Sequence, residues 1–460
     1  MPCGAFPPTR CWNLRIKTVH WAISEDVVHD THETLNGDIT LTPEWVAHLT
    51  GGKLHPPTRP AYDLHWDSRK ISPGVAFFAL PGNTVHGREY VQQALNAGAN
   101  FVVTDSALPG AVEVSRPEQA LLSVGRALRE HFKGQVLAVG GSSGKTTTKE
   151  CLAQGLDWPA PEGNLNNAPG LARFFLHLKQ APGSVVELGI DRLLEMAELA
   201  YLARPDFAVL TSLGVEHLDG LGSLENIARE ESWLLQVSPV RLASVQAGEM
   251  VHLAGLKTYG LEAGDFQAKN LEFSLSQSRF TYGSYHVTLP YPGLGPVLGA
   301  VAALAASEML DKPLSETVER LAHLRLPPGR MERQERGGIT FINDAYNSNP
   351  LSFKAGMEFL QTQPGRKWLV LGRMAELGHE AYRHHLEAAH LAALVSPHLL
   401  FIGEYAQEQA AAVGGIPVQT IQEAAQRLRQ LVQPGDLVYL KASRSVGLEA
   451  LLGLWQEERA

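Results

Sequence analysis

Cysteine is scarce in this sequence. Only Cys3, Cys11 and Cys151 occur among 460 residues. Three scattered cysteines exclude a disulfide framework and a zinc site built on closely spaced cysteines. This usage fits a reducing compartment, so we expect a cytoplasmic protein.

Long apolar runs and a basic excess are also missing. No run approaches the roughly 18–20 apolar residues that cross a bilayer, so we expect no membrane span. No continuous apolar stretch follows Arg10, Arg15 and Lys17, and we therefore expect no signal peptide. The net charge of −9 argues against a nucleic-acid partner, although it leaves room for a local basic pocket.

The composition is typical of a globular protein, with 44% hydrophobic and 19% charged residues. Strand-like and helix-like segments alternate in three successive regions, which predicts an α/β fold of three consecutive α/β domains. The expected strands are 75–80 and 101–104 in the first region, 136–139, 184–188 and 207–211 in the second, and 339–342, 367–371, 398–402 and 437–440 in the third.

The predicted domain limits are 39–128, 129–322 and 323–460. We expect a mostly parallel, P-loop ATPase-like sheet in the central domain and a Rossmann-like C-terminal domain. Residues 1–38 show no clear periodicity. We interpret them either as a disordered extension or as the product of a start site placed too early.

The most informative motif is a phosphate loop between the second region's first strand and a helix that begins near Thr146. Glycines there allow backbone N–H groups to surround phosphate oxygens, and the helix N-terminus adds its dipole. Lys145 is expected to neutralise the β- and γ-phosphates, and the Thr146 hydroxyl to bind Mg²⁺. Val139 stands where the usual spacing has a glycine, and a turn that binds nothing is the alternative. The predicted loop residues are Gly141, Ser142, Ser143, Gly144, Lys145, Thr146 and Thr147.

Further motifs follow in an order that resembles the Mur ligase family over roughly residues 40 to 450. The central region has Gly163-Asn164-Leu165-Asn166-Asn167, Glu187-Leu188-Gly189 and Gly214-Val215-Glu216-His217. The third region continues with Gly329-Arg330-Met331-Glu332, Asp344-Ala345-Tyr346-Asn347-Ser348-Asn349-Pro350 and Lys441-Ala442-Ser443-Arg444-Ser445. Asp67-Ser68-Arg69-Lys70 resembles the family's uridine-nucleotide domain.

The resemblance implies an ATP- and Mg²⁺-dependent ligase that activates a carboxylate as an acyl phosphate, which an amine then attacks. Within the family, the runs around Asn166 and Asn347 look most like members that add D-alanyl-D-alanine to UDP-N-acetylmuramoyl-tripeptide. These two small molecules are therefore the expected substrates, and a monomer is expected. A family member with another amine, and a ligase-like protein that binds without turnover, remain alternatives.

Site roles are carried over residue by residue. Glu187, at a strand end, is expected at Mg²⁺ with Thr146, and His217 at a second Mg²⁺. Lys145, His217 and Arg330 are the predicted catalytic residues, and Asp344 and Asn347 are predicted to contact the nucleotide. The predicted substrate-binding residues are Ser68, Arg69, Asn166, Asn167, Lys441 and Arg444. The alternatives without a functional role are a solvated carboxylate at Glu187, a turn at Asn347 and an exposed salt bridge at Arg69.

Two departures from the family pattern stand out. Many members carry a carbamylated lysine where this chain has Glu231, and we hypothesise that the glutamate carboxylate replaces the carbamate at the metal. Ordinary charges on a helix face at Glu230 and Glu231 are the alternative. The usual polar run beside adenine is replaced by 293–299, which lacks all three polar side chains.

Overall fold

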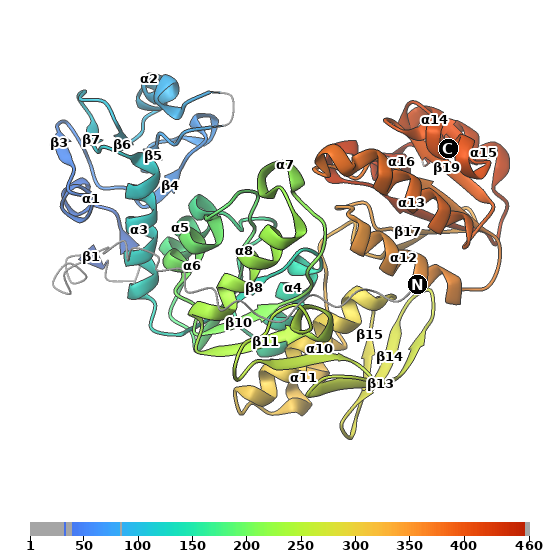
Figure 1. The fold of residues 1–460 in the computed structure, drawn as a ribbon. Helices are drawn as coiled ribbons and strands as arrows, with labels where there is room; N and C mark the ends of the chain where they lie inside the picture. Colours follow the sequence, from blue (N-terminus) through green and yellow to red (C-terminus); the bar gives the residue numbers. More distant parts are fainter. Residues whose placement is uncertain (1–31, 34–38, 83–84, 456–460) are drawn as a thin grey trace.

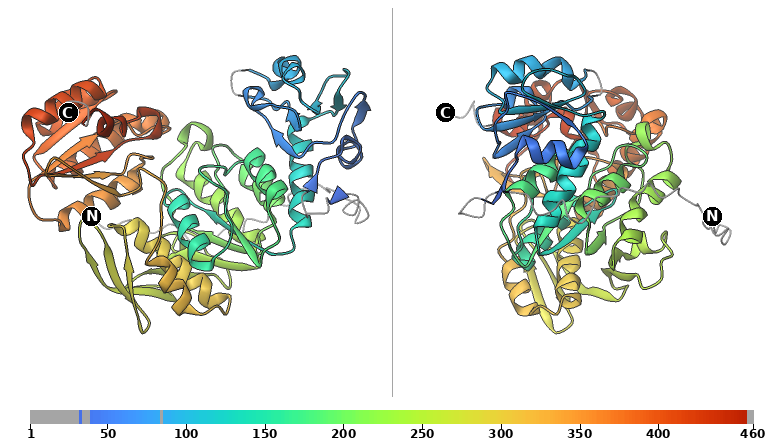
Figure 2. Two further views of the ribbon diagram at one scale, coloured as in Figure 1. Left: turned by 180° about the vertical axis from the view of Figure 1, so that it is seen from behind. Right: turned by 90° about the vertical axis from the view of Figure 1, so that its left-hand side faces the viewer.

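The computed structural model describes residues 32–33, 39–82 and 85–455, and shows three α/β units along the chain (Figure 1). The N-terminal and C-terminal units lie on either side of the central unit (Figure 2). Most of the expected 1–38 extension lies outside the described residues. None of the described helices is both long and apolar enough to cross a membrane.

The N-terminal unit is built on a five-stranded sheet. Its strand order is β3 (Lys53–His55), β7 (Ala111–Glu113), β6 (Phe101–Thr104), β5 (Val75–Phe78) and β4 (Asp63–His65). Every residue of β5 and β6 is buried, because helices or loops cover both faces. The expected strands at 75–80 and 101–104 are confirmed. Helices α1 (Pro43–Thr50) and α2 (Val91–Asn96) flank this sheet.

Helix α3 (Pro117–His131) joins the first unit to the second (Figure 1). Its buried Arg129 donates to the carbonyl of Ala203 at 2.9 Å and to Asp206 Oδ2 at 2.9 Å. A buried guanidinium that is satisfied in this way fixes the helix on the central unit. The predicted limit at residue 128 falls within α3, and the domain limits stay predictions.

The central unit has an eight-stranded sheet. Its order is β15 (Tyr285–Leu289), β14 (Ser278–Tyr282), β13 (Phe266–Phe273), β12 (Lys257–Leu261), β11 (Val240–Ser244), β10 (Phe207–Leu210), β8 (Gln135–Gly140) and β9 (Gly183–Glu187). The pairs from β9 to β13 are parallel, and β13, β14 and β15 pair antiparallel. The sheet is therefore mixed, with the expected parallel part around the phosphate loop.

Two helical layers cover this sheet. Alternate residues of β8 and β10 belong to different hydrophobic cores, as the two-residue period of a strand requires. One core includes residues of α5 (Ala168–His177), α6 (Glu195–Ala203) and α8 (Leu224–Val237). The other includes α4 (Lys145–Leu156), α10 (Leu294–Met309) and α11 (Leu314–Leu321). This layering holds the carboxyl ends of the parallel strands at one edge.

The C-terminal unit has a six-stranded sheet. Its order is β16 (Glu332–Arg336), β17 (Ile339–Asn343), β21 (Leu437–Lys441), β18 (Lys367–Leu371), β19 (His398–Ile402) and β20 (Ile416–Val418). All its pairs are parallel except the one with β16. The four expected strands are confirmed. Helices α12 (Pro350–Thr362), α13 (Ala381–Ala393), α14 (Ala406–Val413) and α15 (Ile421–Leu431) connect them.

Candidate active site

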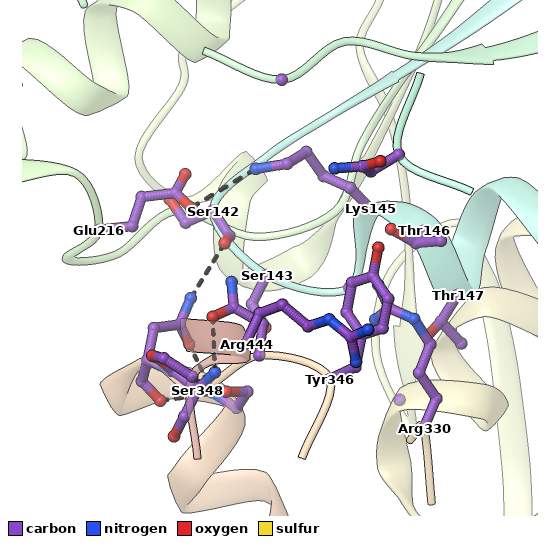
Figure 3. Close-up of a pocket in the computed structure, with 18 of the residues that line it drawn as sticks. Ser142, Ser143, Lys145, Thr146, Thr147, Glu216, Arg330, Tyr346, Ser348 and Arg444 are labelled. Carbon is purple, nitrogen blue, oxygen red and sulfur yellow. Dashed lines mark hydrogen bonds and ion pairs between the residues drawn. The ribbon is translucent and has the colours of Figure 1, made fainter. Parts of the chain in front are cut away.

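A cavity of about 630 Å³ lies where the central and C-terminal units meet. It is lined by the phosphate loop and strand-end residues of the central sheet, and by loop residues of the C-terminal unit (Figure 3). Ligands of open α/β sheets bind at the carboxyl ends of strands, so this is the expected place for a nucleotide. The predicted residues in its wall are Ser142, Ser143, Gly144, Lys145, Thr146, Thr147, Asn166, Asn167, Glu187, His217, Arg330, Asp344, Asn347, Lys441 and Arg444.

The phosphate loop has the backbone geometry that its glycines permit. Gly141 has φ 119° and Gly144 has φ 84°, in the left-handed region where a side chain would strain the chain. Helix α4 begins at Lys145, immediately after the second glycine. The loop is braced from outside, since Ser143 N donates to Ser212 Oγ at 2.9 Å and Thr211 Oγ1 donates to Ser143 O at 2.6 Å.

Lys145 is the cation at the centre of the site. Its Nζ donates to Gly141 O at 2.5 Å and lies 3.4 Å from Glu216 Oε2. Burial alone would lower the pKa of Lys145, but the charges of Glu216, Glu231 and Glu187 outweigh it and raise the pKa. The ammonium therefore remains charged at neutral pH, as phosphate binding requires.

Two buried carboxylates in the cavity wall carry unused oxygens. Glu187 is 5% exposed, and its Oε1 accepts from Asn166 Nδ2 at 3.0 Å. Glu216 is 7% exposed, and burial raises its pKa despite the charge of Lys145. Glu187 Oε2 and Glu216 Oε1 are both buried without a hydrogen-bond partner. Buried carboxylate oxygens of this kind need a cation or a donor.

These oxygens fit a magnesium ion beside the phosphate loop. Mg²⁺ takes oxygen ligands and shares them with phosphates and water, so it needs few protein groups. Thr146, at the start of α4, adds a hydroxyl in the same wall. Among the described residues, no group of three or more His, Cys, Asp or Glu forms a ready-made cage. The donor set is that of a phosphate-assisted Mg²⁺ site.

His217 connects the two units. It is the N-cap residue of the short helix α7 (Leu218–Leu221), and its Nδ1 lies 2.7 Å from Glu376 Oε2 of the C-terminal unit. Burial would lower the pKa of His217, but the Glu376 hydrogen bond and the Glu216 charge raise it. Next to it, Leu218 N donates to Glu376 O at 2.9 Å. A further cross-unit bond joins Asn349 Nδ2 to Ser142 O at 3.0 Å.

The C-terminal wall carries two arginines on one aromatic ring. The Arg330 guanidinium lies 4.1 Å from the centre of the Tyr346 ring, and that of Arg444 lies 5.8 Å from it (Figure 3). Arg330 Nε is buried without a partner, whereas Arg444 Nη1 donates to Glu449 at 2.6 Å. Stacking on the ring leaves guanidinium edges for phosphate or carboxylate oxygens.

Asp344 accepts from three donors, one of which is Met331 N, at 3.3 Å from Oδ1. Its Oδ2 accepts from Lys441 Nζ at 2.6 Å and from Tyr439 OH at 2.8 Å. Lys441 is only 2% exposed, so its ammonium is paired with Asp344 and buried. Lys441, predicted to bind substrate, therefore lies in the cavity wall. Its partner in the structure is Asp344, the residue predicted to contact the nucleotide.

Several predicted polar residues have local structural partners. Asn167 caps α5, since its Oδ1 accepts from Gly170 N at 3.0 Å. Asn347 Oδ1 accepts from Ser348 N at 2.8 Å. Each still lines the cavity. Where the family's polar run is missing, the wall is formed by Gly293, Leu294, Gly295 and Pro296.

Four predicted residues lie outside the cavity wall, namely Gly141 of the phosphate loop, Ser68, Arg69 and Glu231. In the N-terminal unit, Ser68 Oγ donates to Gln93 Oε1 at 3.2 Å, and Arg69 pairs with Asp67 at 2.8 Å while remaining exposed. Glu231 is fully buried on α8, and its Oε2 accepts from Gly141 N at 2.7 Å. The structure thus places Glu231 behind the phosphate loop, because its short side chain ends at the loop backbone.

The sequence reasoning passed over Glu216, Tyr346, Glu376 and Asn349 as site residues. Glu216, Tyr346 and Asn349 stand inside the quoted motifs, so their positions could be read from the sequence but their roles could not. Glu376 lies in the sequence next to Met374-Ala375 and reaches His217 only through the packing of two units. Nothing local in the sequence predicts that contact.

Comparison with known families agrees with this site. Residues 62–133 match the description "Mur ligase family, catalytic domain", residues 139–307 match "Mur ligase middle domain", and residues 329–444 match "Mur ligase, glutamate ligase domain". The matches follow the three structural units in order.

Individual relatives match nearly end to end. A Bacillus subtilis protein named UDP-N-acetylmuramoyl-tripeptide--D-alanyl-D-alanine ligase is 29% identical, over 90% of this chain and 98% of its own. The Escherichia coli protein of the same name is 28% identical, over 91% and 99%.

Solved structures give the same result. A crystal structure of MurF from Acinetobacter baumannii superposes with a TM-score of 0.83 at 28% identity, covering 91% of this chain and 99% of that one. MurF from Thermotoga maritima in complex with ADP has a TM-score of 0.78 at 26% identity, over 86% and 97%. The three consecutive domain matches, together with these relatives, show that the chain belongs to the Mur ligase family.

Proposed function

We propose that this chain is an ATP-dependent ligase that joins D-alanyl-D-alanine to UDP-N-acetylmuramoyl-tripeptide in peptidoglycan precursor synthesis. The observation that carries the proposal is the cavity in which Lys145 and the buried carboxylates of the central unit face Arg330 and Asp344 of the C-terminal unit. Relatives with this named activity match about nine-tenths of the chain.

The chemistry follows from the charges in the cavity. The γ-phosphate of ATP and the tripeptide carboxylate are both anionic, so their approach needs cations on both sides. Lys145 and Arg330 supply them from opposite units. The carboxylate attacks the γ-phosphorus to give an acyl phosphate and ADP. The free amine of D-alanyl-D-alanine then attacks the acyl carbon, and phosphate leaves.

Mg²⁺ is the proposed cofactor beside ATP, held by Thr146 and Glu187, with His217 at a second ion. Bound there, it would neutralise phosphate charge and draw electron density from the phosphorus that is attacked. Asn166 donates to Glu187 in a 3.0 Å hydrogen bond and is proposed to contact the muramoyl-side substrate. Asp344 and Asn347 are proposed to contact the nucleotide sugar.

Substrate recognition extends beyond the cavity. We keep Ser68 and Arg69 as proposed contacts of the uridine diphosphate in the N-terminal unit. Asn167, Lys441 and Arg444 remain proposed substrate contacts at the cavity. The cytoplasm is the proposed compartment, since the reaction consumes ATP, and a monomer remains the proposed state. No nucleic-acid partner is proposed.

Phosphate release from Mg-ATP tests the proposal. With UDP-N-acetylmuramoyl-tripeptide present, we expect release to depend on D-alanyl-D-alanine and to be much slower with D-alanine or without an amine. Release that follows a different amine would leave the ligase chemistry intact and replace the substrate. No release with any amine would favour a protein that binds without turnover.

A further inference from the structure

Glu216 is the buried carboxylate for which the predicted chemistry gives no task. It is 7% exposed, lines the cavity, and directs its side chain toward Lys145 (Figure 3). Its Oε1 is buried without any hydrogen-bond partner. An acidic group this deeply buried costs free energy unless a cation or a donor reaches the second oxygen.

Glu231, which stands at the carbamylated-lysine position, has one oxygen committed to the phosphate loop, whereas its Oε1, like that of Glu216, is buried without a partner. Glu231 Oε2 accepts from Gly141 N at 2.7 Å and faces the loop from the α8 side. The fit is tight, because a Cβ built on Gly140 would lie 2.8 Å from the same oxygen. Glu231 is fully buried and absent from the cavity wall, so its carboxylate supports the loop backbone.

The imidazole beside Glu216 is oriented for a shared ligand. Glu376 holds Nδ1 of His217 at 2.7 Å, which leaves Nε2 directed away from that bond. Nε2 lies 3.8 Å from Glu216 Oε2. A histidine whose other nitrogen is fixed by a carboxylate is the usual arrangement of a metal ligand.

The charge balance in the cavity changes when phosphate binds. Lys145 is now shared between Gly141 O and Glu216 Oε2. A bound β- or γ-phosphate competes for the same ammonium, which leaves Glu216 with a buried charge and no cation. A divalent ion held by Glu216 and His217 would restore this balance.

We propose that Glu216 and Nε2 of His217 take a divalent cation next to the ATP phosphates, whereas Glu231 braces the phosphate loop through Gly141 N–H. This assignment rests on the proposed ATP-dependent function. It replaces the hypothesis that Glu231 itself substitutes for the carbamate at the metal. In this assignment Glu231 supports the phosphate loop, and Glu216 binds the ion.

The test is a titration of the full chain with Mn²⁺, a paramagnetic stand-in for Mg²⁺, in the presence of ADP. Free Mn²⁺ is followed by electron paramagnetic resonance, so the readout does not depend on any amine or on turnover. The variants are Glu216→Gln, Glu231→Gln and, as a control with the same change of charge on the exposed face of α8, Glu225→Gln. Thermal unfolding checks that each variant is folded.

We expect Glu216→Gln to weaken the Mn²⁺ site by roughly 10- to 100-fold. Glu231→Gln keeps an acceptor oxygen for Gly141 N–H, so its Mn²⁺ affinity should stay within about twofold of wild type, like that of Glu225→Gln. Should Glu231→Gln misfold, Glu216→Gln alone still decides whether Glu216 binds the ion.

A loss of Mn²⁺ affinity in Glu231→Gln with none in Glu216→Gln would overturn the assignment and restore the carbamate-replacement hypothesis. Unchanged affinity in both variants would overturn it as well. Failure of the proposed function would look different, because the wild-type protein would then bind Mn²⁺ and ADP without releasing phosphate for any amine.

Discussion

His217 Nδ1 lies 2.7 Å from Glu376 Oε2, and these two residues belong to units whose sheets share no strand. The contact brings the C-terminal unit against the phosphate-loop edge of the central unit. The same edge receives Asn349, whose amide reaches Ser142 O. The cavity therefore depends on the docking of two separately folded sheets, as expected of an enzyme that closes on its substrates.

Replacing Glu376 with Gln should weaken this docking. His217 has a raised pKa, so the stabilisation from its charge is fully present below the ordinary histidine value of about 6.5 and is lost as the pH rises through the folded value. In Glu376→Gln, the pKa of His217 should fall and the KM for ATP should rise roughly two- to fivefold. Histidine NMR without divalent cations and steady-state kinetics measure the two effects. An unchanged His217 pKa would show that the contact is absent in solution.

Removing the Lys145 ammonium should abolish most turnover. In Lys145→Met the γ-phosphate loses the buried cation of the central unit, and we expect kcat to fall about 100- to 1,000-fold. Calorimetric titration with ADP should show weaker binding. Lys149 offers a matched control on the same helix, because its Nζ donates to Pro161 O at 2.7 Å and does not line the cavity. A Lys145→Met enzyme with near-normal kcat would contradict the assigned role.

Much of this architecture could be predicted from the sequence, because periodicity and motif order are local signals. The sequence placed Lys145, Glu187 and Asp344 at or just after the carboxyl ends of strands. In the structure β8 ends at Gly140, β9 at Glu187 and β17 at Asn343, as expected. The antiparallel extension formed by β13 to β15 was missed, because its half-exposed strands lack the apolar runs of the parallel ones.

Contacts that depend on side-chain length and on packing between units could not be read from the sequence. Register predicts Glu231 at the metal, but it could not predict that a side chain several atoms shorter than a carbamylated lysine accepts from Gly141 N–H. Similarly, motif resemblance placed Lys441 at the substrate, although its first partner is the Asp344 carboxylate.

The pair of buried Lys441 and partly buried Asp344 should be costly to break from one side. Lys441→Met leaves the Asp344 carboxylate with hydrogen-bond donors but no cation, so we expect a loss of about 2–4 kcal/mol in the free energy of unfolding of the C-terminal unit. Adding Asp344→Asn should recover part of that loss. Denaturant unfolding of both single variants and the double variant measures the coupling. Strictly additive effects would mean that the 2.6 Å contact contributes nothing.

The N-terminal unit should loosen from the central unit in acid. Asp63 of β4 pairs with Arg173 and His177 of α5, at 2.8 and 2.9 Å. Burial opposes ionisation of Asp63, but the hydrogen bonds from these partners prevail and hold its pKa well below the usual value.

A depressed folded pKa means that the stabilisation is complete above the unfolded value of about 3.9 and is lost as the pH falls below it. At pH 7, Asp63→Asn should reduce stability by about 1–3 kcal/mol. The difference in stability between Asp63→Asn and wild type should become smaller below about pH 4. Thermal unfolding across this pH range measures this difference. If the stability difference between the two proteins became larger in acid, the proposed role of the ionised Asp63 would be wrong.

The central claim is that this cavity forms one specific amide bond. The most direct measurement is mass spectrometry of the product after the purified chain is incubated with Mg-ATP, UDP-N-acetylmuramoyl-tripeptide and D-alanyl-D-alanine. The account predicts a UDP-N-acetylmuramoyl-pentapeptide formed in equal amount with ADP and phosphate, and at least about 100-fold slower formation of it with Lys145→Met. ATP hydrolysis without that product, or the product of a different amine, would contradict the account.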